Sequence, residues 1–256
     1  PYLSRGLGDV YKRQVRTYEK SKEFTKSYGF RMKTDSENKL TRNTGFYERT
    51  SKLTRNFVDA RGFWLPNDYT KHGVINEYNA CREKAVLIDL SSLRKFEILG
   101  PDAEELMNYT LTRNIKKLSV GQIVYSAMCY ENGTMFDDGT LLKLSDHGFR
   151  WVCGDEYGGE WLKEQAKKKN YKVHIKNSTD QINNLSLQGP KSREILEKII
   201  FTPPTQPSIS ELEWFRFSIC RLEELNGIPL IVSRTGYTGE LGFEIWCHPS
   251  DAPTVW

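Results

Sequence analysis

The chain has little cysteine, and no two of its cysteines form a C-x-x-C pair. The five that occur are Cys81, Cys129, Cys153, Cys220 and Cys247. An odd, scattered set of cysteines is typical of reduced thiols and does not build a disulfide framework. We therefore expect a protein of a reducing compartment, the cytoplasm or, in a eukaryote, the mitochondrial matrix.

Three other features are lacking, and each excludes a class of function. The four histidines show no metal-ligand spacing among themselves or with the cysteines, so we expect no metal site. No apolar run is long enough to span a bilayer, so we expect no membrane partner. Charge of one sign does not dominate, because 37 basic residues stand against 33 acidic ones, and the composition does not demand a nucleic-acid partner.

The ends of the chain differ in character from its middle. Residues 4–14, SRGLGDVYKRQ, resemble an in-frame translation of a sequencing-library adapter, so we exclude residues 1–14 from fold reasoning. Residues 15–56 are polar and lack apolar periodicity, which predicts a loop, an extended arm or partial disorder, with aromatics such as Phe46 and Tyr47 pinning parts of it to the body. Organised structure is expected over residues 57–256, and the chain reads as a fragment cut at both ends.

The 38% hydrophobic content of this 256-residue chain is sufficient for a sizeable core in one large domain or two smaller ones. Two stretches, FEILGPDAEELMN and LSLQGPKSREILE, both read as a strand, a Gly-Pro turn and a helix. This weak repeat predicts two related α/β units, at about residues 57–170 and 171–256. Within them we expect helices over residues 74–85, 103–111, 156–169 and 192–200.

The most informative stretch is GQIVYSAMCYENGTMFDDG, residues 121–139. It reads as a strand, a turn at Gly133 and a returning strand that reaches Asp137 and Asp138. Neighbouring side chains of a strand point to opposite faces, so one aspartate is expected in solvent and the other in the interior. A carboxylate inside needs a partner, although paired aspartates at a strand end also commonly cap a turn.

A second stretch of interest is RTGYTGELGFE, residues 234–244. It is not a phosphate loop, because no lysine and no helix follow its glycines, which can serve turn geometry alone. Glu244 alternates with Phe243 and Ile245 in an apolar strand, where an inward carboxylate requires a polar partner.

Six blocks together carry a family resemblance: GFWLP, ACREKAVLIDLSS, FEILGPDAEEL, GQIVYSAMCYENGTMFDDG, LSLQGP and SRTGYTGELGFEIW. Over about residues 57–256 the chain resembles the aminomethyltransferase (glycine cleavage T-protein) family of tetrahydrofolate-dependent one-carbon enzymes. The resemblance implies an α+β fold of two related α/β units with mostly antiparallel sheets. It also implies a folate channel and a third, C-terminal β domain that is missing here.

The resemblance also implies roles for four residues. Asp138 matches the catalytic aspartate, and Tyr125 matches a tyrosine of the folate channel. Tyr237 and Glu244 match the tyrosine and glutamate that hold the pterin ring. The implied reaction moves a one-carbon unit from an amine-type donor to N5 of tetrahydrofolate, and the implied partners are small molecules and a lipoyl carrier protein.

Three departures from the family pattern concern the donor and not the folate. Ser92 stands where T-proteins usually carry histidine, residues 153–155 replace a segment that usually contains asparagine, and Gly139 replaces an apolar residue. DLSSLRKFEI is similar to the T-protein-like part of dimethylglycine and sarcosine dehydrogenases. Two alternatives therefore stay open: the folate half of a flavin-dependent demethylating dehydrogenase, and a non-catalytic folate-binding accessory protein.

Overall fold

The computed structural model describes residues 41–256. The chain divides into two units, Pro1–Arg42 and Asn43–Trp256, and the description below concerns the second. The expectation for residues 1–14, and that for the first part of the polar arm, lie outside the described residues. A two-residue strand, β1 (Arg42–Asn43), spans the boundary between the units.

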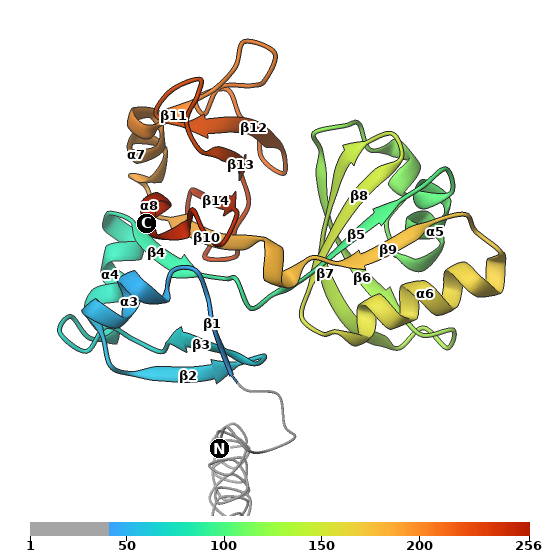
Figure 1. Ribbon diagram of the computed structural model, residues 1–256, viewed down its shortest axis with the longest axis horizontal. Coiled ribbons are helices and arrows are strands. Elements are labelled where there is room, and N and C mark those ends of the chain that lie inside the picture. Colours follow the sequence, from blue (N-terminus) through green and yellow to red (C-terminus); the bar gives the residue numbers. More distant parts are fainter. Residues whose placement is uncertain (1–40) are drawn as a thin grey trace, which may run out of the picture. The chain divides into compact units, whose positions relative to one another are not determined.

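A five-stranded antiparallel sheet, in the order β6-β7-β8-β5-β9, occupies one side of the second unit (Figure 1). Its strands are β5 (Arg94–Leu99), β6 (Ile123–Cys129), β7 (Met135–Ser145), β8 (Gly148–Cys153) and β9 (His174–Asn177). Helices α5 (Ala103–Thr110) and α6 (Tyr157–Lys169) cover one face, and the short η1 helix (Ile115–Lys117) follows α5. The core between the helices and the sheet includes fully buried Leu106, Phe149 and Leu162.

A six-stranded sheet, in the order β11-β12-β13-β14-β10-β4, has antiparallel ladders throughout. Its strands are β4 (Val86–Asp89), β10 (Asn183–Gln188), β11 (Ile200–Phe201), β12 (Phe217–Leu222), β13 (Pro229–Ser233) and β14 (Gly242–Cys247). The helices of this region are η2 (Thr179–Gln181), α7 (Ser192–Ile199) and α8 (Ala252–Val255). The mostly antiparallel α+β architecture agrees with the fold class expected from the sequence.

Part of the expected polar arm is ordered and helical. Helix α3 (Tyr47–Leu53) follows Phe46, whose ring is fully buried in the core of the six-stranded sheet. The hydroxyl of Thr44 donates a hydrogen bond of 2.6 Å to the carboxylate of Asp89. From residue 43 onward the segment is therefore docked, as its aromatics led us to expect, but it forms a helix in place of a loop or extended arm.

The next elements are a hairpin of β2 (Phe57–Ala60) and β3 (Phe63–Pro66), followed by helix α4 (Val74–Glu83). Four expected helices are present as α4, α5, α6 and α7, with ends within about two residues of those predicted. α4 buries none of its residues, and its apolar side chains Val74 and Tyr78 are exposed.

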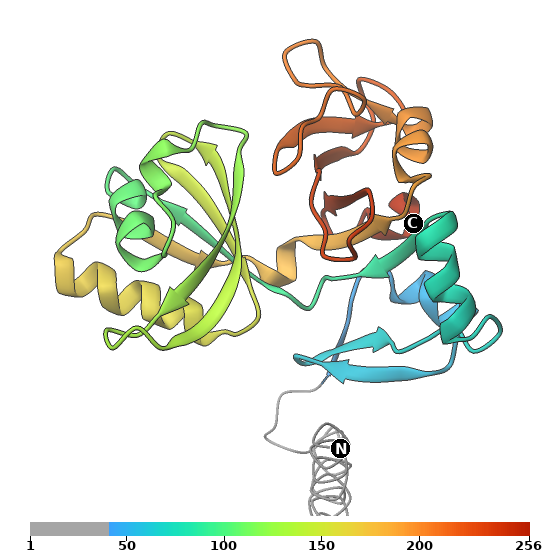
Figure 2. The ribbon, with the colours of Figure 1, turned by 180° about the vertical axis from the view of Figure 1, so that it is seen from behind.

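The two sheets exchange strands, so they do not follow the expected division at residue 171. β4 precedes β5 in sequence but belongs to the six-stranded sheet, and β9 precedes β10 but belongs to the five-stranded sheet. Residues 90–93 and 178–182 therefore cross from one sheet to the other (Figure 2). An apolar cluster that contains Ile123 and Val152 of one sheet and Phe217 and Trp246 of the other joins the two sheets.

Candidate functional site

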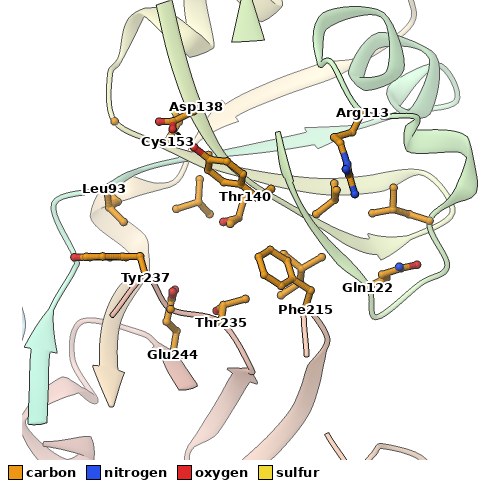
Figure 3. A pocket seen from close by; sticks show the side chains of 18 of the residues that line it. Leu93, Arg113, Gln122, Asp138, Thr140, Cys153, Phe215, Thr235, Tyr237 and Glu244 are labelled. Atoms are coloured by element: carbon orange, nitrogen blue, oxygen red, sulfur yellow. Dashed lines mark hydrogen bonds between the residues drawn. The ribbon is translucent and has the colours of Figure 1, made fainter. Parts of the chain in front are cut away.

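A cavity of about 1130 Å³ lies where the two sheets meet. All four residues singled out from the sequence line it: Tyr125, Asp138, Tyr237 and Glu244. Figure 3 shows Asp138 above Tyr237, with Glu244 and Thr235 below and Arg113 on the far side of the opening. Tyr125 and Glu244 are 119 positions apart in the sequence, yet both line this cavity. The role of each of the four residues is still a prediction.

Asp138 and Tyr125 form a hydrogen-bonded pair on the cavity wall. Ala127 is directly opposite Asp138 in the β6–β7 ladder, and Tyr125 lies two residues away on the same face. The hydroxyl of Tyr125 donates to Oδ2 of Asp138. This hydrogen bond to the carboxylate is the main cause that raises the pKa of Tyr125. The pair presents an oriented carboxylate to the cavity while the tyrosine side chain is 54% exposed.

Asp137 has a different environment and does not line the cavity. Its carboxylate accepts hydrogen bonds from the backbone N–H of Asp138 at 2.9 Å, Gly154 at 3.3 Å and Asp155 at 3.2 Å. The residue opposite it in the ladder, Met128, is fully buried. The two aspartates thus leave opposite faces of β7, with Asp138 turned to the open cavity and Asp137 turned inward, where it caps the loop after β8.

Gly139 allows β7 and β8 to approach closely beside the cavity. A Cβ at this position would overlap the carbonyl oxygen of Val152 on the neighbouring strand. The apolar residue usual in T-proteins would require the two strands to separate. Glycine at this position therefore allows the close strand packing in the wall next to Asp138.

Glu244 supplies a buried carboxylate to the opposite wall. Its side chain projects from β14 and is only 9% exposed, and Asn184 of β10 donates a hydrogen bond of 2.9 Å to Oε2. Burial is the main cause that raises the pKa of Glu244. In the described part of the chain no cation forms a salt bridge with this carboxylate. A ligand with N–H donors would satisfy its remaining acceptor capacity.

The glycine-rich segment that carries Tyr237 is wrapped around the side chain of Gln188. The amide of Gln188 donates to the carbonyl of Thr235 at 3.1 Å and accepts from the hydroxyl of Thr238 at 3.0 Å. A Cβ at either Gly236 or Gly242 would overlap this amide. The glycines therefore serve loop geometry, and the loop holds Tyr237 at the cavity with its side chain 74% exposed.

A buried lysine supports the segment that forms another part of the wall. Lys95 of β5 is 0% exposed, and its ammonium donates to the carbonyls of Ser91 at 2.9 Å and Leu93 at 2.8 Å. Burial lowers the pKa of Lys95 to about 7, while buried Asp89 partly opposes this shift. These hydrogen bonds from Lys95 thus hold the crossing segment 90–93, which contributes Leu90 and Leu93 to the cavity.

Sequence reasoning missed the cations of the cavity. Arg61, Arg113 and Lys117 line it, and all three are exposed. Arg61 adopts a left-handed backbone conformation with φ of 56° in the β2–β3 turn and donates from Nε to the carbonyl of Gly154 at 2.7 Å. None of these positions carries a motif, and only the basic character of residues 113–117 was visible in the sequence.

Residues 41–256 contain neither a metal-ligand cluster nor a membrane-spanning helix. No group of three or more histidine, cysteine, aspartate or glutamate side chains there could hold a metal ion. No helix in that range is both long and apolar enough to cross a bilayer.

Comparison with known proteins places this geometry in a family. Residues 46–256 match the GCVT N-terminal domain. The chain is 52% identical over 241 residues to trimethylamine-oxide aldolase from Ruegeria pomeroyi. This match covers 94% of this chain and 30% of that protein. It is 36% identical over 202 residues to an aminomethyltransferase from Alkaliphilus metalliredigens, and this match covers 78% of this chain and 52% of that protein.

A solved structure gives the same result. Glycine cleavage system aminomethyltransferase T from Bartonella henselae superposes with a TM-score of 0.71 at 25% identity, over 84% of this chain and 56% of that one. The chain thus spans about half the length of these aminomethyltransferases and a smaller share of the aldolase. The matched domain, the relatives and the fold together show that the chain belongs to the aminomethyltransferase (glycine cleavage T-protein) family.

Proposed function

We propose that the cavity binds tetrahydrofolate and that the protein transfers a one-carbon unit from an amine-type donor to N5 of this folate. The observation that carries the proposal is the arrangement of two carboxylates on opposite walls of one cavity. Glu244 is buried and forms no salt bridge within residues 41–256, whereas Asp138 is oriented by Tyr125. The family relationship supports the same assignment, since both residues lie within the matched domain.

The residues present fit a pterin ring. The edge of such a ring offers N–H donors, and a buried carboxylate such as Glu244 can accept two of them in parallel. Asn184 and Thr235 both hydrogen-bond to Glu244, and among the described residues the buried Oδ1 of Asn184 has no partner. Tyr237 offers an exposed ring at the same end of the cavity for contact with the face of the pterin.

The proposed chemistry requires a fixed negative charge close to the reacting nitrogen. Tetrahydrofolate, when bound, would supply the secondary amine N5 as the acceptor of the one-carbon unit. Asp138 stabilises positive charge that develops on nitrogen during transfer, and Tyr125 holds its carboxylate in one orientation. Such preorganised charge contributes about 10²–10⁴-fold when it also moves a proton.

A specific observation favours a methylamine oxide as the origin of the one-carbon unit. The relative that is 52% identical to this chain is a trimethylamine-oxide aldolase. Cleavage of trimethylamine oxide with all atoms retained gives dimethylamine and formaldehyde, and formaldehyde condenses readily with amines. As a second candidate function, formaldehyde that such a cleavage releases would condense with the amine nitrogens of the same bound folate, and its oxygen would leave as water.

The first experiment measures folate binding by the 256-residue chain. Titration with tetrahydrofolate should show a saturable site, and Glu244→Ala should weaken it by about 1–3 kcal/mol through loss of a charged hydrogen-bond partner. Glu240→Ala is the matched control, since Glu240 lies on the same loop but pairs with Arg82 at 2.8 Å outside the cavity. Equal losses in both variants, or no saturable binding by the unaltered chain, would refute the folate site.

The second experiment identifies the donor. Tetrahydrofolate consumption is followed by chromatography with formaldehyde, trimethylamine oxide, dimethylglycine or sarcosine as the added compound. Consumption with formaldehyde that Asp138→Asn abolishes supports capture, whereas consumption with an amino-acid donor alone supports the aminomethyltransferase reaction. A protein that binds folate yet accelerates none of these reactions is the non-catalytic accessory protein.

A further inference from the structure

Lys95 is a buried cation that the function proposed above does not use. Its side chain is fully buried on β5, and among residues 41–256 no carboxylate forms a salt bridge with it. Its ammonium instead donates to the carbonyls of Ser91 at 2.9 Å and Leu93 at 2.8 Å on the crossing segment 90–93. A buried charge is costly unless it stabilises neighbouring groups, so we ask which groups depend on it.

A chain of hydrogen bonds connects Lys95 to the cavity carboxylate of Glu244. The ammonium holds the carbonyl of Ser91, and the hydroxyl of Ser91 accepts from the backbone N–H of Asn184 at 3.1 Å. The backbone N–H of Leu90 donates to the carbonyl of Asn184 at 2.9 Å, which attaches the crossing segment to β10 a second time. The side-chain amide of Asn184 then donates to Oε2 of Glu244 at 2.9 Å. The position of Glu244 therefore depends on the segment that Lys95 holds.

The charged groups that act on Lys95 lie on four strands. They are Asp89 at the end of β4, Arg94 on β5, Arg150 on β8 and Glu244 on β14. Both arginines have carboxylate partners of their own, and Asp89 accepts two hydrogen bonds from other groups. Within this set of charges, Lys95 is therefore the cation that is available to balance Glu244.

The charge of Lys95 favours the ionised form of Glu244. Burial raises the pKa of Glu244, whereas hydrogen bonds from Asn184 and Thr235 and the charge of Lys95 lower it. An ionised carboxylate can accept N–H donors through both oxygens, and a protonated one has less acceptor capacity. Burial also lowers the pKa of Lys95 to about 7, and the charge of Asp89 opposes this shift. Lys95 thus loses its charge in a pH range where proteins commonly work.

We propose that Lys95 is a positioning residue of the cavity, which acts through Asn184 and Glu244 so that a ligand with N–H donors binds most tightly while Lys95 is protonated. The proposal rests on the function proposed above, and Lys95 itself does not line the cavity. Loss of the proton removes the charge that favours ionised Glu244 and weakens the hold on the crossing segment. By linkage, the bound ligand favours protonated Lys95, so binding takes up protons. Titration of Glu244 alone has the opposite sign, because its ionisation on binding releases protons.

The first test measures tetrahydrofolate binding by the unaltered 256-residue chain at several pH values. Affinity should fall by about 5-fold or more between about pH 6 and about pH 9, as Lys95 loses its proton. Calorimetry near neutral pH, in buffers that differ in their enthalpy of ionisation, should show net proton uptake on binding. Neither measurement requires a variant, so both hold even where a substitution at Lys95 prevents folding.

The second test uses Lys95→Met, which keeps the length of the side chain and removes the charge. This variant should bind tetrahydrofolate at about pH 6 as weakly as the unaltered chain does at about pH 9, with a flat pH profile. Lys143→Met is the matched control, since Lys143 is a buried strand lysine that pairs with Glu104 at 2.6 Å and does not line the cavity. It should keep the pH profile of the unaltered chain, and thermal midpoints show that each variant is folded.

Three results would overturn the proposal. Affinity that rises with pH, or proton release on binding, assigns the pH dependence to Glu244 alone. A flat profile in the unaltered chain, or an unchanged profile in Lys95→Met, shows that Lys95 serves the fold and not the ligand. Absence of tetrahydrofolate binding at every pH refutes the proposed function and this proposal with it, whereas the first two results leave the folate site standing.

Discussion

The hydroxyl of Tyr125 donates a hydrogen bond to Asp138, which lies diagonally across the β6–β7 ladder and not in the directly opposite position. The residue opposite Tyr125 is Thr140, and the residue opposite Asp138 is Ala127. A small side chain at Ala127 leaves room for the tyrosine to lean along the strand. The orientation of the carboxylate is thus determined by the register of the hairpin.

We predict that Tyr125→Phe lowers turnover by about 10-fold and leaves the thermal midpoint unchanged. The variant removes the hydrogen bond that orients Asp138, while the half-exposed ring contributes little to the core. Tyr130→Phe is the control, because that tyrosine lies near the tip of the same hairpin and outside the cavity. Steady-state kinetics on both variants decide the matter, and equal turnover in both would remove Tyr125 from the mechanism.

Asp138→Asn should reduce turnover by about 100-fold or more while tetrahydrofolate affinity stays nearly constant. Asparagine keeps the shape and still accepts one hydrogen bond, but it lacks the charge that matters most in the transition state. Parallel kinetics and folate titration test this separation. A variant that loses folate binding and keeps its turnover at saturation would show that Asp138 binds and does not catalyse.

Asp137→Asn is expected to act on stability more than on turnover. Its carboxylate accepts three backbone N–H groups, and the amide would place an N–H donor against at least one of them. We expect a loss of about 1–3 kcal/mol in the free energy of unfolding, which denaturant titration measures. Turnover at a temperature where the variant is folded should fall far less than in Asp138→Asn, and the reverse order would exchange the roles of the two aspartates.

Lys95 should make stability depend on pH on the alkaline side of neutrality. Burial lowers its pKa to about 7 in the folded state, so between about pH 7 and the ordinary lysine value near 10.4 the unfolded chain binds more protons. The free energy of unfolding should therefore rise with pH over this window, by at most about 1.4 kcal/mol per unit. Below about pH 7 both states carry the proton, so this contribution no longer changes with pH.

Denaturant titrations from pH 6 to pH 9 measure this rise, and Lys95→Met should remove it. Lys143→Met provides a matched control, because Lys143 is another buried strand lysine but pairs with Glu104 at 2.6 Å. A rise that persists in Lys95→Met would assign the pH dependence to other groups. Buried Asp89 and Glu244 face Lys95, and their raised pKa values act in the opposite direction at lower pH.

Local sequence signals predicted the hairpin and the helices well, because turn residues and apolar periodicity are local properties. The β6–β7 hairpin and its turn at Gly133 follow from such signals, as do α5, α6 and α7. The sequence did not reveal the helix that follows Phe46 or which aspartate of the pair turns inward. Both depend on partners far along the chain, the core of the six-stranded sheet and the loop at Gly154.

The candidate site was predictable to a similar extent. Tyr125, Asp138, Tyr237 and Glu244 could be selected because they match family motifs, and all four line one cavity. The sequence marks residue 188 only as part of a strand, although Gln188 supports the Tyr237 loop. It marks residue 113 only as part of a connection, although Arg113 lines the cavity across from Asp138 and Glu244 (Figure 3). Their positions emerge from the meeting of the two sheets, which no local pattern encodes.

The exchange of strands between the sheets determines how the protein can be divided. Separate expression of residues 57–170 would remove β9 and leave β5 as an unpaired edge, while the other half would lose β4 and expose β10. Unpaired edges of this kind promote intermolecular strand pairing, so each half alone should aggregate. Joint expression of the halves should restore solubility, because each half supplies the strand that the sheet of the other half lacks. Solubility of the pair would then report that the two halves have assembled.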